Sequence, residues 1–280
     1  WTACRFRAVK ASRMMDGYYL YRRYIGASIR GQMQYPGSFL MISLGEFIVT
    51  LTEFIGIWVL FHRFGQIRGW TFAEIAMFYG TVSVSFAIAD AISRGFDVFG
   101  PQFVKTGNFD RLLVRPRAVT LQLLGYELRL NRIGRLMQGV LVLAIAMHLL
   151  GIHWDARNLA LFAAAIAGGI ALFVGILILQ ATLAFWTIES LEIANTLTYG
   201  GVEASQYPLD IYSRWFRDFL IFVVPIGCVT YVPILRLLGN RELPAPGWLL
   251  DAAPLCGIIF LMIALCAWRL GVRHYTSTGT

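Results

Sequence analysis

Charged residues are scarce in this chain, and their scarcity limits the class of protein. Only 14% of the 280 residues are Asp, Glu, Lys or Arg, whereas 58% are hydrophobic and the mean hydropathy is +0.63. A soluble domain carries about 25% charged residues, and a water-soluble core cannot absorb this much apolar surface. The composition therefore excludes an ordinary soluble domain and indicates a protein that lies mostly in a membrane.

Cysteine and metal-binding patterns are also scarce. The four cysteines include no CxxC pair, and Cys256 and Cys266, in one apolar run, would lie about 15 Å apart on a helix. That separation is too long for a disulfide. No HExxH or similar ligand spacing is present, so the sequence predicts neither a metal site nor a cofactor bound by this chain.

Nucleotide-binding and catalytic motifs are missing as well. The segment nearest to a phosphate-binding loop runs from Gly100 to Thr106, but Val104 stands where that loop needs its second glycine. The glycine lets backbone amides surround a phosphate, so this segment does not predict a nucleotide site. No Gly-x-Ser-x-Gly elbow or carboxylate cluster indicates catalysis. We therefore expect a chain that is not an enzyme, and any uphill transport would draw its energy from a partner or an ion gradient.

Long apolar runs are abundant. Runs of roughly 18 residues or more, enough to cross a hydrocarbon layer of about 30 Å, recur along most of the chain. They predict an all-α polytopic membrane protein whose six spans cover residues 38–61, 72–92, 133–150, 159–186, 189–206 and 253–270. Residues 1–37 mix basic and aromatic side chains, so we expect an interfacial, elbow-like helix region there, followed by a membrane domain over 38–280.

The distribution of basic residues predicts the orientation of the spans. With the N-terminus inside, 17 of the 24 Lys and Arg residues fall in inside segments. Cytoplasmic loops of membrane proteins carry such an excess of positive charge, so we expect both termini in the cytoplasm. The net charge of +8 is then expected to face anionic headgroups rather than nucleic acid.

The sequence allows two positions for the fifth span. Hydropathy favours residues 215–238, which are strongly apolar but contain Pro225 and Pro233, over the more polar residues 189–206. A span at 215–238 would also raise the number of inside basic residues to 19. The two prolines instead favour a re-entrant helix pair at 213–238, which enters the membrane and returns on the same side. We place the fifth span at 189–206 and keep 215–238 as the alternative.

Two stretches resemble a known family, and the resemblance covers most of the chain from residue 20 onward. Residues 107–116, GNFDRLLVRP, resemble the motif G-x-(F/L)-D-x-L-L-x-(R/K)-P of the permease subunits of type-2 ABC transporters. In that family this connection carries the coupling helix that docks on the ATPase. The resemblance implies a coupling region at 94–117 with contact residues Phe109, Asp110, Arg111, Leu112, Leu113, Arg115 and Pro116. A basic loop that rests on lipid headgroups is the alternative.

The second stretch lies after the predicted fifth span. It contains Tyr207-Pro208-Leu209, Trp215-Phe216 and Pro225, and it is similar to the family's Y-P-L … L-P-x-W-L-R … N-P segment. Val224 replaces the usual Asn, and Ser213 replaces a proline that often precedes the Trp. Candidates for an outer gate are Tyr207, Pro208, Trp215, Pro225 and Pro233. A static cap with interfacial aromatic residues is the alternative.

Carboxylates inside the predicted spans are candidates for a translocation path. Glu46 and Glu53 lie on one face of the first span with Thr50 between them, and Glu192 and Asn195 give the fifth span a similar polar character. A carboxylate at membrane depth costs a few kcal/mol, so it should face protein, water or a basic partner. Pairing with arginines at a subunit interface is the alternative.

The resemblance also implies a function and partners. The chain is expected to be the permease subunit of an ATP-driven ABC exporter in the bacterial cytoplasmic membrane, paired with a second copy or a related permease. ATP and Mg would bind to a cytoplasmic ABC ATPase dimer, and membrane lipids would surround the spans. The competing hypothesis is a secondary transporter driven by protons or cations through Glu46, Glu53 or Glu192. The long basic connection and the lack of a visible repeat between the halves favour the exporter.

Overall fold

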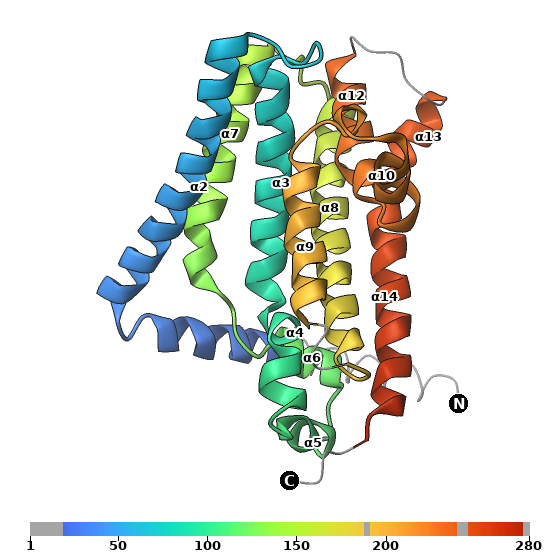
Figure 1. Cartoon of the computed structure of the whole chain (residues 1–280). Helices are drawn as coiled ribbons and strands as arrows, with labels where there is room; N and C mark the ends of the chain where they lie inside the picture. The colour runs from blue at the N-terminus through green and yellow to red at the C-terminus, as the bar shows by residue number, and fades with distance from the viewer. Residues whose placement is uncertain (1–18, 188–190, 240–245, 277–280) are drawn as a thin grey trace, which may run out of the picture.

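The computed structural model describes residues 19–187, 191–239 and 246–276, and it leaves out the side chains of residues 191–197. Within these residues the chain forms helices and no strand, which confirms the predicted all-α class. The long helices are α2 (Pro36–Phe64), α3 (Phe72–Ile92), α7 (Ile133–Leu150), α8 (Ala156–Leu183) and α14 (Leu255–His274). Figure 1 shows them side by side in one bundle.

These five helices are long and apolar enough to cross a membrane. They correspond to predicted spans one to four and six, and the helices at 72–92 and 133–150 have the predicted bounds. The fourth begins at Ala156 rather than 159, because the Asp155 carboxylate accepts a hydrogen bond from the Asn158 backbone N–H at 2.8 Å and starts the helix earlier. At the start of α3, Thr71 and Glu74 cap each other's backbone N–H.

Small residues bring α8 and α14 into close contact. A Cβ on Gly257 would overlap the carbonyl oxygen of Gly168, and one on Gly168 would overlap the carbonyl oxygen of Pro254. The pair has the most extensive contact of any two helices in the described residues. The small residues of the fourth span, Ala164, Gly168, Ala171 and Gly175, predict such an approach, and α14 is the helix that approaches.

Short helices occupy one end of the bundle, which we call the α5 end (Figure 1). They are α4 (Arg94–Asp97), η1 (Gly100–Val104), α5 (Asn108–Leu113), α6 (Val119–Leu124) and η2 (Leu130–Arg132). A helix over residues 19–32, here named the interfacial helix, lies across the foot of α2. The described chain also ends here, at Thr276 after α14.

The opposite end, the α12 end, carries a cap of broken helices. It consists of η3 (Leu209–Ile211), α10 (Arg214–Asp218), η4 (Phe219–Val223), α11 (Ile226–Val229), α12 (Tyr231–Leu238) and α13 (Gly247–Ala252). The helical segments on either side of Val224-Pro225 bend by 73°. Proline removes a backbone donor and breaks the helix at this point. This bend is the shape that a re-entrant pair requires.

The helix α9 (Leu191–Ser205) fills the position predicted for the fifth span and packs against α3 and α8. Its 15 residues span only about 22 Å, less than a full hydrocarbon layer. The bent pair, taken as one element, is long and apolar enough to be a span instead. The assignment of the fifth span to α9 therefore stays a prediction.

Candidate functional site

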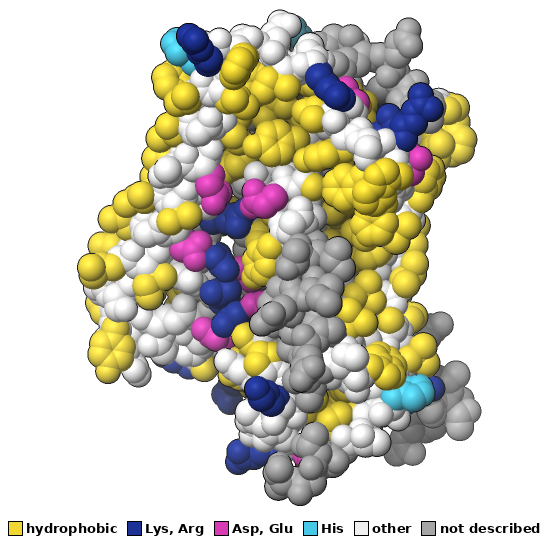
Figure 2. Space-filling model, in the orientation of Figure 1, with side chains coloured by type: hydrophobic (Ala, Val, Ile, Leu, Met, Phe, Trp, Pro, Cys, Tyr) yellow, Lys and Arg dark blue, Asp and Glu magenta, His cyan; other side chains and the backbone are white. Residues whose placement is uncertain are grey.

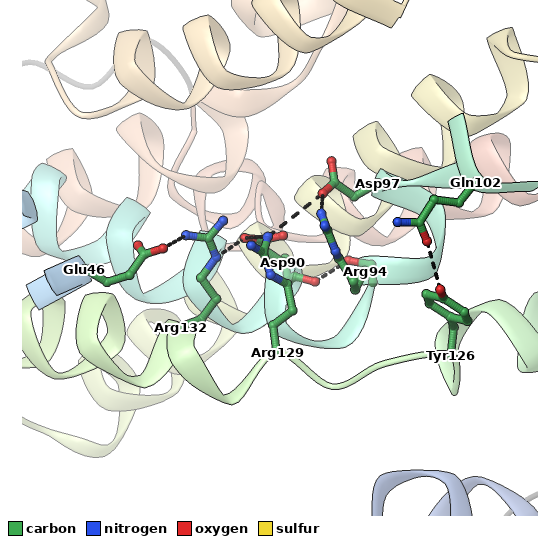
Figure 3. A network of polar contacts seen from close by, with 10 residues as sticks. Glu46, Asp90, Arg94, Asp97, Gln102, Tyr126, Arg129 and Arg132 are labelled. Atoms are coloured by element: carbon green, nitrogen blue, oxygen red, sulfur yellow. Dashed lines mark hydrogen bonds and ion pairs between the residues drawn. The ribbon is translucent and has the colours of Figure 1, made fainter. Parts of the chain in front are cut away.

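A chain of ion pairs crosses the interior of the bundle from α2 to α4 (Figure 3). The Glu46 carboxylate accepts a hydrogen bond of 2.6 Å from the Arg132 guanidinium, which also pairs with Asp90 through its Nε. Arg129 lies 3.5 Å from Asp90 and 4.0 Å from Asp97. We call this set the charge ladder, and its members are Glu46, Asp90, Arg94, Asp97, Arg129 and Arg132.

The charge ladder balances three carboxylates with three guanidinium groups. Asp90 is 0% exposed, and an ion buried at membrane depth is tolerated only when an opposite charge compensates it. Two arginines flank Asp90 and supply that compensation. Each of the three carboxylates of the charge ladder is therefore paired with at least one arginine inside the bundle.

Local backbone contacts bring the arginines to α2 and α3. The Arg129 backbone N–H donates to the Ala91 carbonyl at 3.0 Å, which joins the end of α3 to the segment before η2. A Cβ on Gly134 would overlap the Ser43 carbonyl, so only glycine lets α7 approach α2 this closely. This approach places Arg132 within reach of Glu46.

A second set of polar groups continues the ladder towards the α12 end. The Arg135 guanidinium lies 3.9 Å from the Glu203 carboxylate and 5.1 Å above the centre of the Phe86 ring. Glu53 is exposed and close enough to Glu203 to interact with it electrostatically. Figure 2 shows side chains of both charges gathered in a hollow beside α2, with hydrophobic side chains on either side. We give the name polar cleft to the charge ladder together with Glu53, Arg135 and Glu203.

The structure brings some of the predicted path residues together and separates others. Glu46 belongs to the charge ladder and Glu53 to the wider polar cleft. Thr50 is buried, and its hydroxyl donates to the Glu46 carbonyl at 3.0 Å, so it supports α2 rather than offering a free group. Glu192 and Asn195 lie outside the described side chains.

Sequence reasoning missed the basic half of the polar cleft. The sequence places Arg129, Arg132 and Arg135 only among the basic residues of an inside segment, and it gives Asp90 no role. A signal was present, because three arginines spaced by three residues lead directly into the third span and would share a face of a helix. Their carboxylate partners come from other helices and are not visible in that spacing.

The residues that the resemblance assigns to ATPase coupling divide into two faces of α5. One face points inward: Phe109 is 0% exposed, and its ring centre lies 5.0 Å from that of Phe99, 5.5 Å from Phe185 and 4.8 Å from Tyr275. We call these rings, together with Trp268, the aromatic cluster. Since Phe185 follows α8 and Trp268 lies in α14, the cluster fastens α5 to the ends of two long helices.

Further contacts hold the inward face of α5. Leu112 is buried, and the Gln122 side chain donates to the carbonyl oxygens of Leu112 and Arg117, both at 3.1 Å. Burial, and then the nearby Asp110 carboxylate, raise the pKa of the Tyr275 hydroxyl above its ordinary value. Asp110 therefore lies beside the end of α14, where a negative charge disfavours the tyrosinate.

The other face of α5 and the turn after it point outward. Arg111, Leu113, Arg115 and Pro116 are exposed, as predicted contact residues should be. Val114, which the resemblance did not single out, is 85% exposed, more than any other large hydrophobic residue that the structure describes. Exposed apolar side chains beside arginines are typical of a surface that a partner covers. We call residues 111 and 113–116 the outward face.

The predicted gate residues are spread over the α12 end. Pro208 and Pro233 are buried, Tyr207 and Pro225 are half-buried, and Trp215 is 73% exposed. A contact that the sequence did not reveal joins this cap to the α2–α3 turn. The Trp70 indole N–H donates to both oxygens of Asp210, each at 3.0 Å, and Arg68 donates to the Asp210 and Ile211 carbonyls at 3.2 Å.

A comparison with protein families gives one match. The family model described as ABC-2 family transporter protein matches residues 47–279, which is most of the chain. No curated protein and no solved structure matches.

Proposed function

The chain belongs to the ABC-2 transporter family as a membrane permease subunit, and we propose that it serves an exporter whose ATP hydrolysis takes place on a separate cytoplasmic ATPase. The family match and the five long apolar helices together identify the chain as a multi-pass membrane protein. The observation that carries the finer proposal is the division of α5 into an anchored face and an outward face.

The outward face is the proposed docking site for the ATPase. Arg111 and Arg115 would meet carboxylates of a groove on the ATPase, and Leu113 and Val114 would fill its apolar floor. ATP and Mg would bind the partner, where closure of the ATPase dimer on ATP moves the groove. Because Phe109 sits in the aromatic cluster, a push on α5 would reach the ends of α8 and α14 directly.

The polar cleft is the proposed translocation path. It runs from the α5 end to the middle of the bundle. Glu46, Glu53 and the partly buried arginines would offer polar contacts to a solute crossing the hydrocarbon layer. A second copy or a related permease would complete the wall of the path, since one chain leaves the cleft open on one face.

The orientation follows from the same geometry. We propose that the α5 end faces the cytoplasm of a bacterium, because both the interfacial helix and the outward face would then lie on the side of the ATPase. The many Lys and Arg side chains within residues 93–135 support this orientation, because cytoplasmic segments of membrane proteins are rich in basic residues. A proton- or cation-driven secondary transporter would have no use for an outward face of this kind, and vanadate would leave its transport unaffected.

The proposal is tested by copurification with the ATPase. The double variant Arg111→Glu with Arg115→Glu is expected to reduce the bound ATPase by about tenfold, because two attractive charges become repulsive. The matched control is Arg214→Glu with Arg217→Glu, which reverses two arginines of the α12 end. Retention of the full amount of ATPase by the α5 variant, or loss in the control variant alone, would contradict the proposed docking site.

A further inference from the structure

A cavity at the foot of α2 shares Arg94 and Arg129 with the charge ladder, and no residue of the outward face lines it. Its volume is about 330 Å³, within the range of small-molecule pockets. The walls come from the interfacial helix, α2, α4 and the segment before η2. We call it the α2-foot cavity.

One wall of the cavity is fixed by hydrogen bonds between distant segments. The Ser28 hydroxyl accepts from the Leu128 backbone N–H at 3.0 Å, and the Gln32 side-chain oxygen accepts from the Leu130 N–H at 3.1 Å. The Gln32 amide also donates to the Leu128 carbonyl. These bonds tie the interfacial helix to the chain that carries Glu127 and Arg129. The cavity is therefore a built feature of the fold.

The charged lining of the cavity has both signs. Arg94 and Arg129 line it with side chains that are 25% and 18% exposed. The contacts of Arg129 with its carboxylate partners, at 3.5 and 4.0 Å, are longer than the roughly 2.8 Å of a charge-assisted hydrogen bond. Its N–H donors can therefore also serve an anion in the cavity. Glu127 lines the same cavity and makes no ion pair with any residue in the described ranges.

The remaining wall is apolar and belongs to a membrane-spanning helix. Phe39 and Ile42 of α2 line the cavity, and Ile42 is 51% exposed. They lie within two turns of the start of α2, where the headgroup layer gives way to hydrocarbon. A ligand of this cavity would therefore have a polar part at the arginines and an apolar part along α2.

We propose that the α2-foot cavity binds a zwitterionic, amine-bearing phospholipid of the adjoining leaflet. The phosphate would lie on the two guanidinium groups and the ammonium on the Glu127 carboxylate, with the acyl chains along Phe39 and Ile42. A lipid with a glycerol headgroup would match less well, because it carries the same phosphate charge but no ammonium to pair with Glu127. The bound lipid would link the interfacial helix to the first span at the entrance of the polar cleft.

Lipid binding to the purified, delipidated chain in detergent tests this inference by native mass spectrometry. The probes are a phospholipid with an ethanolamine headgroup and one with a glycerol headgroup, each with the same acyl chains. Wild-type protein is expected to hold the ethanolamine lipid with about tenfold preference. Ser38→Trp fills the cavity without removing a charge and should abolish this binding. Met41→Trp is the matched control, because Met41 is 76% exposed on the same helix and does not line the cavity.

A second variant tests the role of the carboxylate. Glu127→Gln should keep phospholipid binding but lose the preference for the amine. Equal lipid binding by wild type and Ser38→Trp, or a wild-type preference for the glycerol headgroup, would overturn the proposal. Displacement of the lipid by inorganic phosphate alone would overturn it too, because the site would then recognise a free phosphate.

Discussion

The arginines of the charge ladder and those of the outward face of α5 make opposite use of the same side chain. Arg129 and Arg132 are mostly buried. Arg129 lies against carboxylates of α3 and α4, and Arg132 lies against carboxylates of α2 and α3. Arg111 and Arg115 are exposed, and neither makes an ion pair with a residue that the structure describes. The two groups are close in sequence but differ in what they face.

This difference indicates what each region can do. Buried paired charges fix the positions of three helices, and removing one partner alone destabilises the fold because the other charge stays buried without compensation. Exposed unpaired charges contribute little to stability and remain free for another protein. Damage to the charge ladder should therefore unfold the permease, whereas damage to the outward face should leave it folded and separate it from its ATPase.

The largest effect on stability is expected from Asp90→Asn. The change leaves Arg132 and Arg129 without their shared carboxylate in the interior, and breaking such a pair costs about 3–5 kcal/mol. The free energy of unfolding in mixed micelles measures it. Asp218→Asn, at an exposed carboxylate beside Arg217, is the control and should change that free energy by less than about 0.5 kcal/mol. Equal free energies of unfolding for the two variants would contradict the claim that the buried ion pairs stabilise the fold more than exposed charges do.

A smaller loss of stability, with a larger loss of coupling, is expected from Phe109→Leu. The change removes ring contacts within the aromatic cluster, at a cost of about 1–2 kcal/mol, but leaves the outward face intact. The ATPase should still bind. The nucleotide-dependent change in reactivity of a cysteine placed at position 212, at the α12 end, should shrink. Phe222→Leu, at an 81% exposed ring, is the control. If the nucleotide-dependent change in cysteine reactivity is as large in Phe109→Leu as in the wild type, the aromatic cluster does not transmit the movement of α5.

The smallest effect on stability is expected at Glu53, whose side chain is exposed to the polar cleft. With the native cysteines replaced by serine, Glu53→Cys should react with a hydrophilic, membrane-impermeant thiol reagent, since a translocation path admits water. Ile55→Cys, two residues along α2 and therefore on another face of the helix, should stay unreactive as a lipid-facing position. Similar rates at both positions would argue against an aqueous path along α2.

The sequence predicts the long helices well because hydropathy and caps are local properties. Residues 72–92 and 133–150 are mostly apolar, and both helices begin and end at the predicted residues. The start of α8 was missed by three residues, although Asp155 is an ordinary N-cap residue. Hydropathy does not register this cap, because Asp155 lies outside the apolar run.

The candidate sites were predicted less completely because they depend on tertiary contacts. The motif around Phe109 located α5, but the rings that bury Phe109 come from residues 99, 185, 268 and 275, which no local pattern connects. Glu46 was singled out as a costly carboxylate, and its partner Arg132 lies 86 residues away in sequence. The spacing of charges along one helix cannot reveal a partner on another.

The most direct test of the central claim is a site-specific photocrosslink from the outward face to the ATPase. A photoreactive amino acid replaces Val114, which is 85% exposed at the α5 end, or Trp248, which is 73% exposed at the α12 end. Irradiation of the copurified complex should give a covalent adduct with the cytoplasmic ATPase from position 114 and none from position 248. An adduct from position 248 without one from position 114 would contradict both the docking site and the orientation.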